Sequence, residues 1–238
     1  MHNPEVNTIV SQKNAIIFDL FHTLTAPEVV SPNGQSTSAI LGVDSRSWNE
    51  QLMEKSKSRL IGLEKDPYEI IEKLAHIINP AISHETIQKA VQNRIKRFED
   101  ALVKMPERSI NTIRKLKEMG KKIALLSNAD VIEAAAWTQC PIAPYFDVVL
   151  FSCNVGYVKP EVEIYELCLQ QLQEKSEDCI FVGDGGSNEF TGAKKVGLST
   201  IMVTGIIENL WPYKIESIKQ QADFVIKNLE ELIDPGEK

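Results

Sequence analysis

The sequence predicts an α/β fold: a doubly wound, mainly parallel sheet with helices on both faces and an all-helical region inserted into it. Three observations support this prediction. Short apolar runs alternate with segments of helical periodicity, which is typical of parallel strands joined by right-handed crossovers. Four of these runs lead into distinctive polar residues, as strands do where open α/β sheets bind ligands. Between about residues 40 and 102, strand-like runs disappear and only helical spacing remains.

Six apolar segments are expected to form the sheet. In chain order they are residues 14–20, 122–126, 147–151, 179–182, 200–203 and 224–226. Helices are expected in the core at about residues 106–119, 131–137, 161–172 and 189–196. The polar residues 1–13 are expected to form a loose lead-in. Residues 25–38 contain two prolines and a glycine and are expected to form a loop.

The inserted region is expected to form three helices, each with apolar residues on one side. The second begins after Asp66, which resembles an N-cap because a proline follows it at the first helical position. The third opens at Ser83, another residue type preferred as an N-cap. We therefore expect a helical cap domain at residues 27–103 and an α/β core domain at residues 1–26 and 104–238.

The composition is that of an ordinary globular protein. The chain has 238 residues, of which 43% are hydrophobic and 25% charged. Its formal net charge of -7 argues against nucleic acid or an anionic membrane as a partner. The N-terminal segment lacks a signal-peptide pattern, and no apolar run is long enough to span a bilayer, so we expect a cytoplasmic protein. The cysteines have no metal-binding spacing and are expected to be buried, reduced thiols: Cys140, Cys153, Cys168 and Cys179. The sequence carries no indication of the oligomeric state.

Candidate functional residues follow the ends of the predicted strands. Asp19 and Ser127 end the first and second strands, Lys159 lies in a loop after the third, and Asp184 follows the fourth. The carboxyl ends of parallel strands meet at one edge of a sheet, so these side chains are expected to converge there. Carboxylates suit Mg²⁺, and an ammonium and a hydroxyl suit a phosphoryl group.

The order and wording of these motifs resemble those of the haloacid dehalogenase (HAD) superfamily. The matching residues are Asp19 with Thr23, Ser127 with Asn128, Lys159-Pro160 with Tyr165, and Gly183-Asp184 with Asn188-Glu189. The inserted helical region lies where subfamily-I members carry their C1 cap. The resemblance covers the chain from its first predicted strand to its last.

The resemblance implies a Mg²⁺-dependent phosphohydrolase that acts on a small phosphorylated metabolite, most similar to the phosphoglycolate phosphatase type. Asp19 would attack phosphorus and form an aspartyl-phosphate, while Lys159 and Ser127 would hold the phosphoryl group. The implied metal ligands are Asp19, the Phe21 carbonyl, Asp184 and Glu189. The implied substrate-binding residues are Phe21, His22, Thr23 and Asn128.

Phe21 departs from the family pattern and leaves alternatives open. Typical HAD phosphatases carry there an Asp that protonates the leaving group, which Phe cannot do. The 2-haloacid dehalogenases of the family have an aromatic residue there, but they typically lack the Gly-Asp metal loop that this chain keeps. The alternatives are therefore a dehalogenase-like hydrolase with an ester at Asp19, or a non-catalytic binding or regulatory protein. His22, which replaces a common Gly, is a candidate proton donor, and Glu189 replaces a common Asp.

Overall fold

A parallel sheet of six strands forms the centre of the α/β part of the molecule. A computed structural model describes residues 4–26 and 35–233, and its strand order is β3-β2-β1-β4-β5-β6. All neighbouring strands are parallel. The strands are β1 (Ala15–Phe18), β2 (Lys122–Ser127), β3 (Val148–Phe151), β4 (Cys179–Gly183), β5 (Ser199–Val203) and β6 (Phe224–Ile226). The predicted doubly wound α/β fold is confirmed. Residues 27–34 of the expected loop lie outside the described residues.

The strand order reverses at β1, and this reversal positions the functional edge of the sheet. The chain runs outward from β1 through β2 to β3, then returns to place β4 on the other side of β1. In open α/β sheets, such a reversal leaves a crevice at the carboxyl ends of the central strands. The chain leaves β1 at Asp19 and β4 at Asp184, so both carboxylates lie at this crevice.

Strand β1 is apolar throughout because both of its faces are covered. Ile16 and Phe18 belong to one buried cluster, and Ala15 and Ile17 belong to another, as the alternation of side chains along a strand requires. All four side chains are fully buried. The first cluster includes side chains of α1 (Pro4–Gln12) and α7 (Glu107–Glu118), and the second includes those of α10 (Val162–Leu172) and α11 (Glu189–Lys195).

The expectation of a loose lead-in at residues 1–13 is wrong for the part that the structure describes. Residues Pro4–Gln12 form α1, and Val6 and Val10, one helical turn apart, are fully buried against the core. Two apolar residues in a polar segment are a weak signal in sequence, and the helix depends on packing against the sheet. Residues 1–3 lie outside the described part of the chain.

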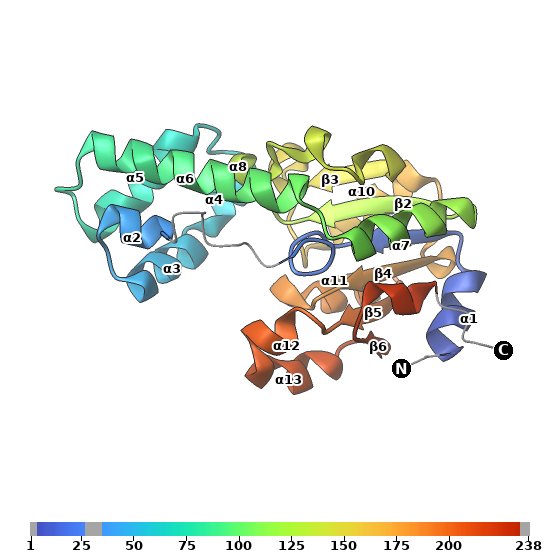
Figure 1. Cartoon of the computed structure of the whole chain (residues 1–238). Helices are drawn as coiled ribbons and strands as arrows, with labels where there is room; N and C mark the ends of the chain where they lie inside the picture. The colour runs from blue at the N-terminus through green and yellow to red at the C-terminus, as the bar shows by residue number, and fades with distance from the viewer. Residues whose placement is uncertain (1–3, 27–34, 234–238) are drawn as a thin grey trace.

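The residues described between β1 and α7 form five helices, which make a layer with its own buried apolar cluster. They are α2 (Thr37–Leu41), α3 (Ser45–Glu54), α4 (Ser56–Leu60), α5 (Pro67–Ile78) and α6 (His84–Val103). Figure 1 shows them on the left, with the long α6 reaching back to the sheet. The predicted N-caps are confirmed: Asp66 accepts from the backbone of Tyr68 and Glu69, and Ser83 accepts from that of Thr86. The division of the chain into domains at residues 27–103 stays a prediction.

Two further expectations concern the cysteines and membranes. The four cysteines are buried free thiols, as the sequence predicts. Among residues 4–26 and 35–233, no helix combines the length and apolar character needed to cross a bilayer.

A buried cluster of charges joins the helical layer to the core. The Arg59 guanidinium of α4 lies 3.0 Å from the Asp130 carboxylate, and the Arg94 guanidinium of α6 lies 2.5 Å from the Glu133 carboxylate. Asp130 caps α8 (Val131–Ala134), which begins just after β2. At the molecule's edge, Lys57 of α4 pairs with Glu161 at 3.1 Å. Removing one partner of a buried pair leaves an uncompensated charge, so the Arg59 and Arg94 contacts, unlike the exposed Lys57 pair, fix the helical layer on the core.

We expect Glu133→Gln to flatten the pH dependence of stability near neutral pH. Burial and the neighbouring Asp130 carboxylate raise the pKa of Glu133 from 4.5 to about 7. The folded protein therefore keeps a proton that the unfolded chain releases. The stabilising contribution is complete below pH 4.5 and is lost as the pH rises through about 7. The loss should be on the order of 1–3 kcal/mol.

Chemical unfolding of the wild type and Glu133→Gln across this pH range measures the difference in the free energy of unfolding. Glu163→Gln, at an exposed glutamate of α10, is the matched control and should follow the wild-type curve. Parallel curves for the wild type and Glu133→Gln would contradict a raised pKa at Glu133.

Candidate active site

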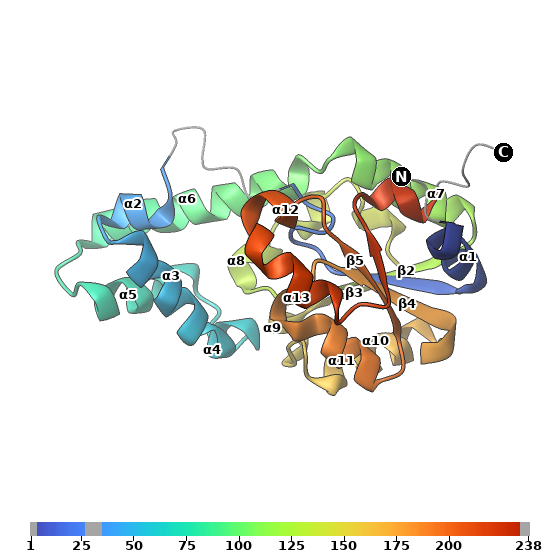
Figure 2. The same ribbon diagram turned by 90° about the horizontal axis from the view of Figure 1, so that it is seen from below.

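A cavity of about 800 Å³ lies over the carboxyl edge of the sheet. Core residues that follow the strands line its inner end, and Asn49 and Met53 of α3 reach it from the helical layer. Figure 2 shows α3 and α4 beside the core, on the side where α12 (Ile207–Leu210) and α13 (Ile215–Lys219) lie. The cavity therefore lies where the helical layer meets the crevice at the strand ends.

Three buried carboxylates gather at the inner end of the cavity. One oxygen each of Asp19, Asp184 and Glu189 lies within 4.8 Å of the others. Burial and the Asp19 charge raise the pKa of Asp184 to about 6. Burial also raises the pKa of Glu189 to about 8, although Lys159 acts in the opposite direction. The raised pKa values mean that ionising these buried carboxylates side by side costs free energy.

Lys159 is the buried cation of this group. Its ammonium lies 2.5 Å from Asp19 Oδ1 and 2.6 Å from Glu189 Oε2. Burial lowers the pKa of Lys159, but the Asp19 and Glu189 charges outweigh burial, and the net pKa is raised. Its backbone is held by Asn128: Lys159 N donates to Asn128 Oδ1 at 2.8 Å, and Asn128 Nδ2 donates to Lys159 O at 3.0 Å. The Asn128 amide therefore positions the lysine.

Two hydroxyl groups lie near the ends of the central strands: that of Thr23, next to Asp19, and that of Ser127, at the end of β2. The Thr23 hydroxyl donates to Asp19 Oδ2 at 3.0 Å, which fixes the orientation of the carboxylate. Ser127 ends β2, is 1% exposed, and its Oγ has no hydrogen-bond partner in the described part of the chain. Buried hydroxyls are normally paired, so this oxygen is an exception, although Ser127 is not among the residues that line the cavity.

The loop after β4 orients Asp184 and Glu189. Gly186 N donates to Asp184 Oδ1, and Gly185 N donates to Glu189 Oε1, each at 2.7 Å. Gly185 has φ +89°, and a Cβ there would lie 2.1 Å from the Ile218 side chain, so only glycine fits. Both Glu189 oxygens accept hydrogen bonds, one from this loop and one from Lys159. Glu189 thus ties the loop to the lysine.

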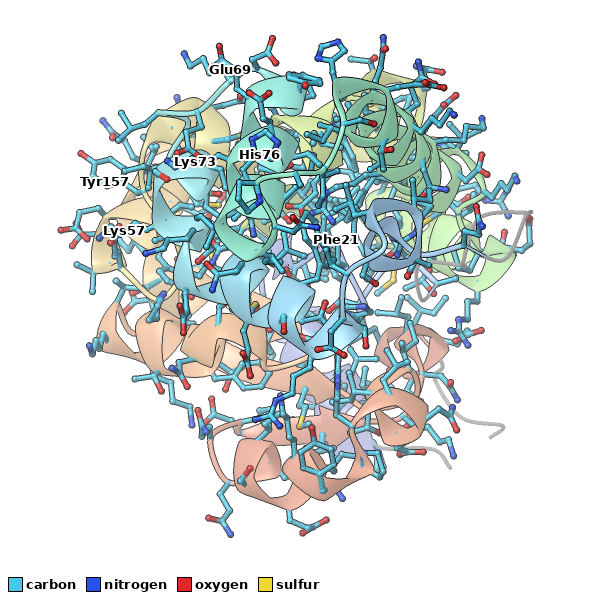
Figure 3. The ribbon with its side chains drawn as sticks, turned by 90° about the vertical axis from the view of Figure 1, so that its left-hand side faces the viewer. Phe21, Lys57, Glu69, Lys73, His76 and Tyr157 are labelled. Carbon is cyan, nitrogen blue, oxygen red and sulfur yellow. The ribbon has the colours of Figure 1, made fainter. Side chains whose placement is uncertain are left out.

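Phe21 and His22 both line the cavity, but their rings have different neighbours. The Phe21 ring meets the Phe98 ring of α6 edge to face, with 5.3 Å between the ring centres. In Figure 3, which views the molecule from the side of the helical layer, Phe21 lies near the centre. His22 has φ +60°; its Nδ1 lies 3.7 Å from Asp184 Oδ2 and its ring lies 5.1 Å from the Trp211 ring. Phe21 therefore packs the core against the helical layer, while His22 faces the carboxylates.

The outer part of the cavity is not predicted from the sequence. Its lining residues on α3 and between β5 and β6 are Asn49, Met53, Trp211, Lys214, Ile218 and Gln221. The available signal was Trp-Pro-Tyr-Lys at residues 211–214, an aromatic and cationic group between two strands. The proposed catalytic and metal-binding roles of the inner residues stay predictions, including that of the Phe21 carbonyl.

Without metal, Asp184→Asn should stabilise the protein and Lys159→Met should destabilise it. The first change removes a buried charge repelled by Asp19, and the raised pKa of Asp184 corresponds to a gain on the order of 1–3 kcal/mol near pH 8. The second leaves three carboxylates without their cation, at a cost of about 3–5 kcal/mol. Chemical unfolding in EDTA measures both effects.

Lys195→Met, at an exposed lysine that ends α11, is the control for the loss of a lysine and should change stability little. A destabilised Asp184→Asn protein in EDTA would show that the three carboxylates do not repel one another as their positions imply.

Comparisons with known proteins identify the family. Residues 13–197 match the family model described as haloacid dehalogenase-like hydrolase. A glyceraldehyde 3-phosphate phosphatase of Methanocaldococcus jannaschii is 28% identical over 137 residues, which cover 56% of this chain and 57% of the relative. The match thus spans little more than half of that relative.

Solved structures share the fold. The L-2-haloacid dehalogenase of Xanthobacter autotrophicus with chloropropionic acid covalently bound has a TM-score of 0.64 at 18% identity, covering 92% of this chain and 96% of the dehalogenase. A HAD family enzyme of Bacteroides thetaiotaomicron in complex with magnesium and inorganic phosphate has a TM-score of 0.58 at 19% identity, covering 80% and 94%. With the family model matching most of its length, the chain belongs to the haloacid dehalogenase-like hydrolases.

Proposed function

We propose that this protein is a Mg²⁺-dependent phosphohydrolase that acts on a small phosphorylated metabolite through an aspartyl-phosphate at Asp19. The observation that carries the proposal is the buried group of three carboxylates around one lysine. Its excess negative charge calls for a cation, and its ammonium suits a phosphoryl group. The phosphatase activity named for the M. jannaschii relative supports the same class of substrate.

The donor set fits Mg²⁺, which prefers oxygen ligands and keeps several waters. We assign Asp19, Asp184 and the Phe21 carbonyl as ligands. Glu189 contributes less directly, because both of its oxygens already accept hydrogen bonds from Lys159 and Gly185. When bound, Mg²⁺ supplies positive charge that neutralises the phosphoryl oxygens. The magnesium and phosphate bound by the B. thetaiotaomicron enzyme support this assignment.

The remaining residues divide the chemistry into two steps. An Asp19 oxygen forms a bond to phosphorus as the ester P–O bond breaks, and the departing oxygen keeps the bonding electrons and takes a proton. A water then attacks phosphorus, which frees Asp19 and releases phosphate. Thr23 keeps Asp19 oriented, and Lys159 and the unpaired Ser127 hydroxyl stabilise charge on the phosphoryl oxygens.

Phe21 determines which substrates react well. Its ring packs against Phe98 and has no proton to donate, so the leaving oxygen depends on His22 or on water. The protein should therefore prefer substrates with good leaving groups. The buried free thiols fit a reducing, cytoplasmic location, and the acidic composition argues against nucleic acid as the substrate. We propose a small-molecule substrate and an enzyme of the phosphoglycolate phosphatase type.

The aromatic residue at position 21 also favours a second candidate, a dehalogenase-like hydrolase that forms an ester at Asp19. Because a halide leaves without needing a proton, a dehalogenase would lose no acid catalysis by having Phe at position 21. The covalent chloropropionic acid complex of the Xanthobacter enzyme shares this chain's fold. Metal dependence separates the two candidates, because ester formation on carbon needs no cation at Asp184.

Asp19→Asn should lower turnover of p-nitrophenyl phosphate by about 10³-fold or more, because it removes the covalent nucleophile. EDTA should abolish the wild-type activity, and Mg²⁺ should restore it. The measurement is a screen of phosphorylated metabolites and 2-haloacids with Mg²⁺ and with EDTA, using a folded Asp19→Asn protein alongside. Turnover of 2-haloacids in EDTA, with no phosphate released from any ester, would assign the dehalogenase chemistry instead.

The rate should fall steeply as the pKa of the leaving group rises. Acid–base assistance is typically worth ~10²–10⁴-fold, and alkyl phosphates should lack most of it. His22→Gly should slow alkyl phosphates selectively if His22 donates the proton, and should leave aryl phosphates nearly unchanged. A leaving-group series at saturating Mg²⁺ tests this. A flat series in the wild type that His22→Gly does not alter would show that another group supplies the proton.

A further inference from the structure

The outer wall of the cavity comes from the segment between β5 and β6, which the proposed chemistry does not use. Trp211 follows α12, Lys214 ends a 3₁₀ turn, and Ser217, Ile218 and Gln221 lie on or just after α13. All five line the same cavity as Asp19. Figures 1 and 2 show α12 and α13 against the edge of the core beside the helical layer.

A continuous row of contacts joins this wall to the proposed metal site. His22 Nδ1 lies 3.7 Å from Asp184 Oδ2, the His22 ring lies 5.1 Å from the Trp211 ring, and the Lys214 ammonium lies 5.4 Å from the centre of the same Trp211 ring. A substrate with its phosphoryl group at Asp19 can therefore extend along these side chains toward Lys214.

The charged side chains that line the cavity change sign along this row, from carboxylates at the inner end to a lysine at the outer wall. Among the described lining residues, the carboxylates all belong to the inner group: Asp19, Asp184 and Glu189. Lys214 is the lysine of the outer wall, and no carboxylate of residues 4–26 or 35–233 lies within 4.0 Å of its ammonium. The rings of Trp211 and Tyr213 flank it at 5.4 and 5.9 Å, contacts that favour a charged ammonium without neutralising it.

We infer that Lys214, supported by the Trp211 ring, is a specificity-determining residue that selects phosphomonoesters carrying a second anionic group remote from the scissile phosphate. The inference rests on the proposed phosphohydrolase function. The second anion is a carboxylate or another phosphate, since either would pair with the ammonium. Asn49 and Met53 of α3 line the same cavity and offer an amide and an apolar side chain to the part of the substrate between its two anions.

The test compares matched substrates that differ only in the second anion. The carboxylate pair is 3-phosphoglycerate and glycerol 3-phosphate, and the phosphate pair is fructose 1,6-bisphosphate and fructose 6-phosphate. In at least one pair, the wild type should have the higher kcat/KM for the substrate that carries the second anion. Lys214→Met should reduce that preference about tenfold, mainly through KM, as expected for one charge-assisted contact. High salt should reduce the wild-type preference in the same direction.

Lys219→Met is the matched control. Lys219 lies on α13, is paired with Glu216 at 3.0 Å and does not line this cavity, so its loss should leave the preference unchanged. Equal kcat/KM within both pairs for the wild type, or an unchanged preference in Lys214→Met, would overturn the inference while phosphatase activity persists. No hydrolysis of any phosphate ester by the wild type, p-nitrophenyl phosphate included, would overturn the proposed function and the inference with it.

Discussion

The arrangement of the site depends on one buried ammonium, Lys159, held between two carboxylates. Asp19 comes from the end of β1 and Glu189 from the start of α11, and both carboxylates contact this ammonium. Asn128 fixes the lysine backbone, and Glu189 also accepts a hydrogen bond from the loop that carries Asp184. Lys159 therefore links the segments that follow β1, β2 and β4.

The same arrangement leaves a charge imbalance that defines the chemistry. A single lysine faces three carboxylates, and burial raises the pKa values of Asp184 and Glu189 because their ionised forms are poorly solvated. A divalent cation would relieve this cost, and a phosphoryl group would add the negative charge that the cation and lysine then share. In the proposed function, the repulsion among these carboxylates favours anionic substrates that bind together with metal.

Much of the fold and the inner site could be predicted because strong local signals coincide with topology. Strand β1 is buried on both faces and therefore reads as an unbroken apolar run, and parallel strands bring Asp19, Ser127 and Asp184 to one edge whatever their separation in sequence. Helix α1 was missed because two buried valines specify it only through packing. The Trp211 and Lys214 wall was missed because short helices with little periodicity carry it, and the contact of Phe21 with Phe98 depends on how the helical layer docks.

In the proposed mechanism, Asp19 carries the phosphoryl group during turnover. The direct measurement is mass spectrometry of the peptide that contains Asp19, after acid quenching of the wild type during hydrolysis of p-nitrophenyl phosphate with Mg²⁺. We expect a phosphoryl adduct on Asp19 that is absent in EDTA and absent from Asp19→Asn. Sustained hydrolysis with Asp19 unmodified at every quench time, and an equally active Asp19→Asn protein, would contradict it.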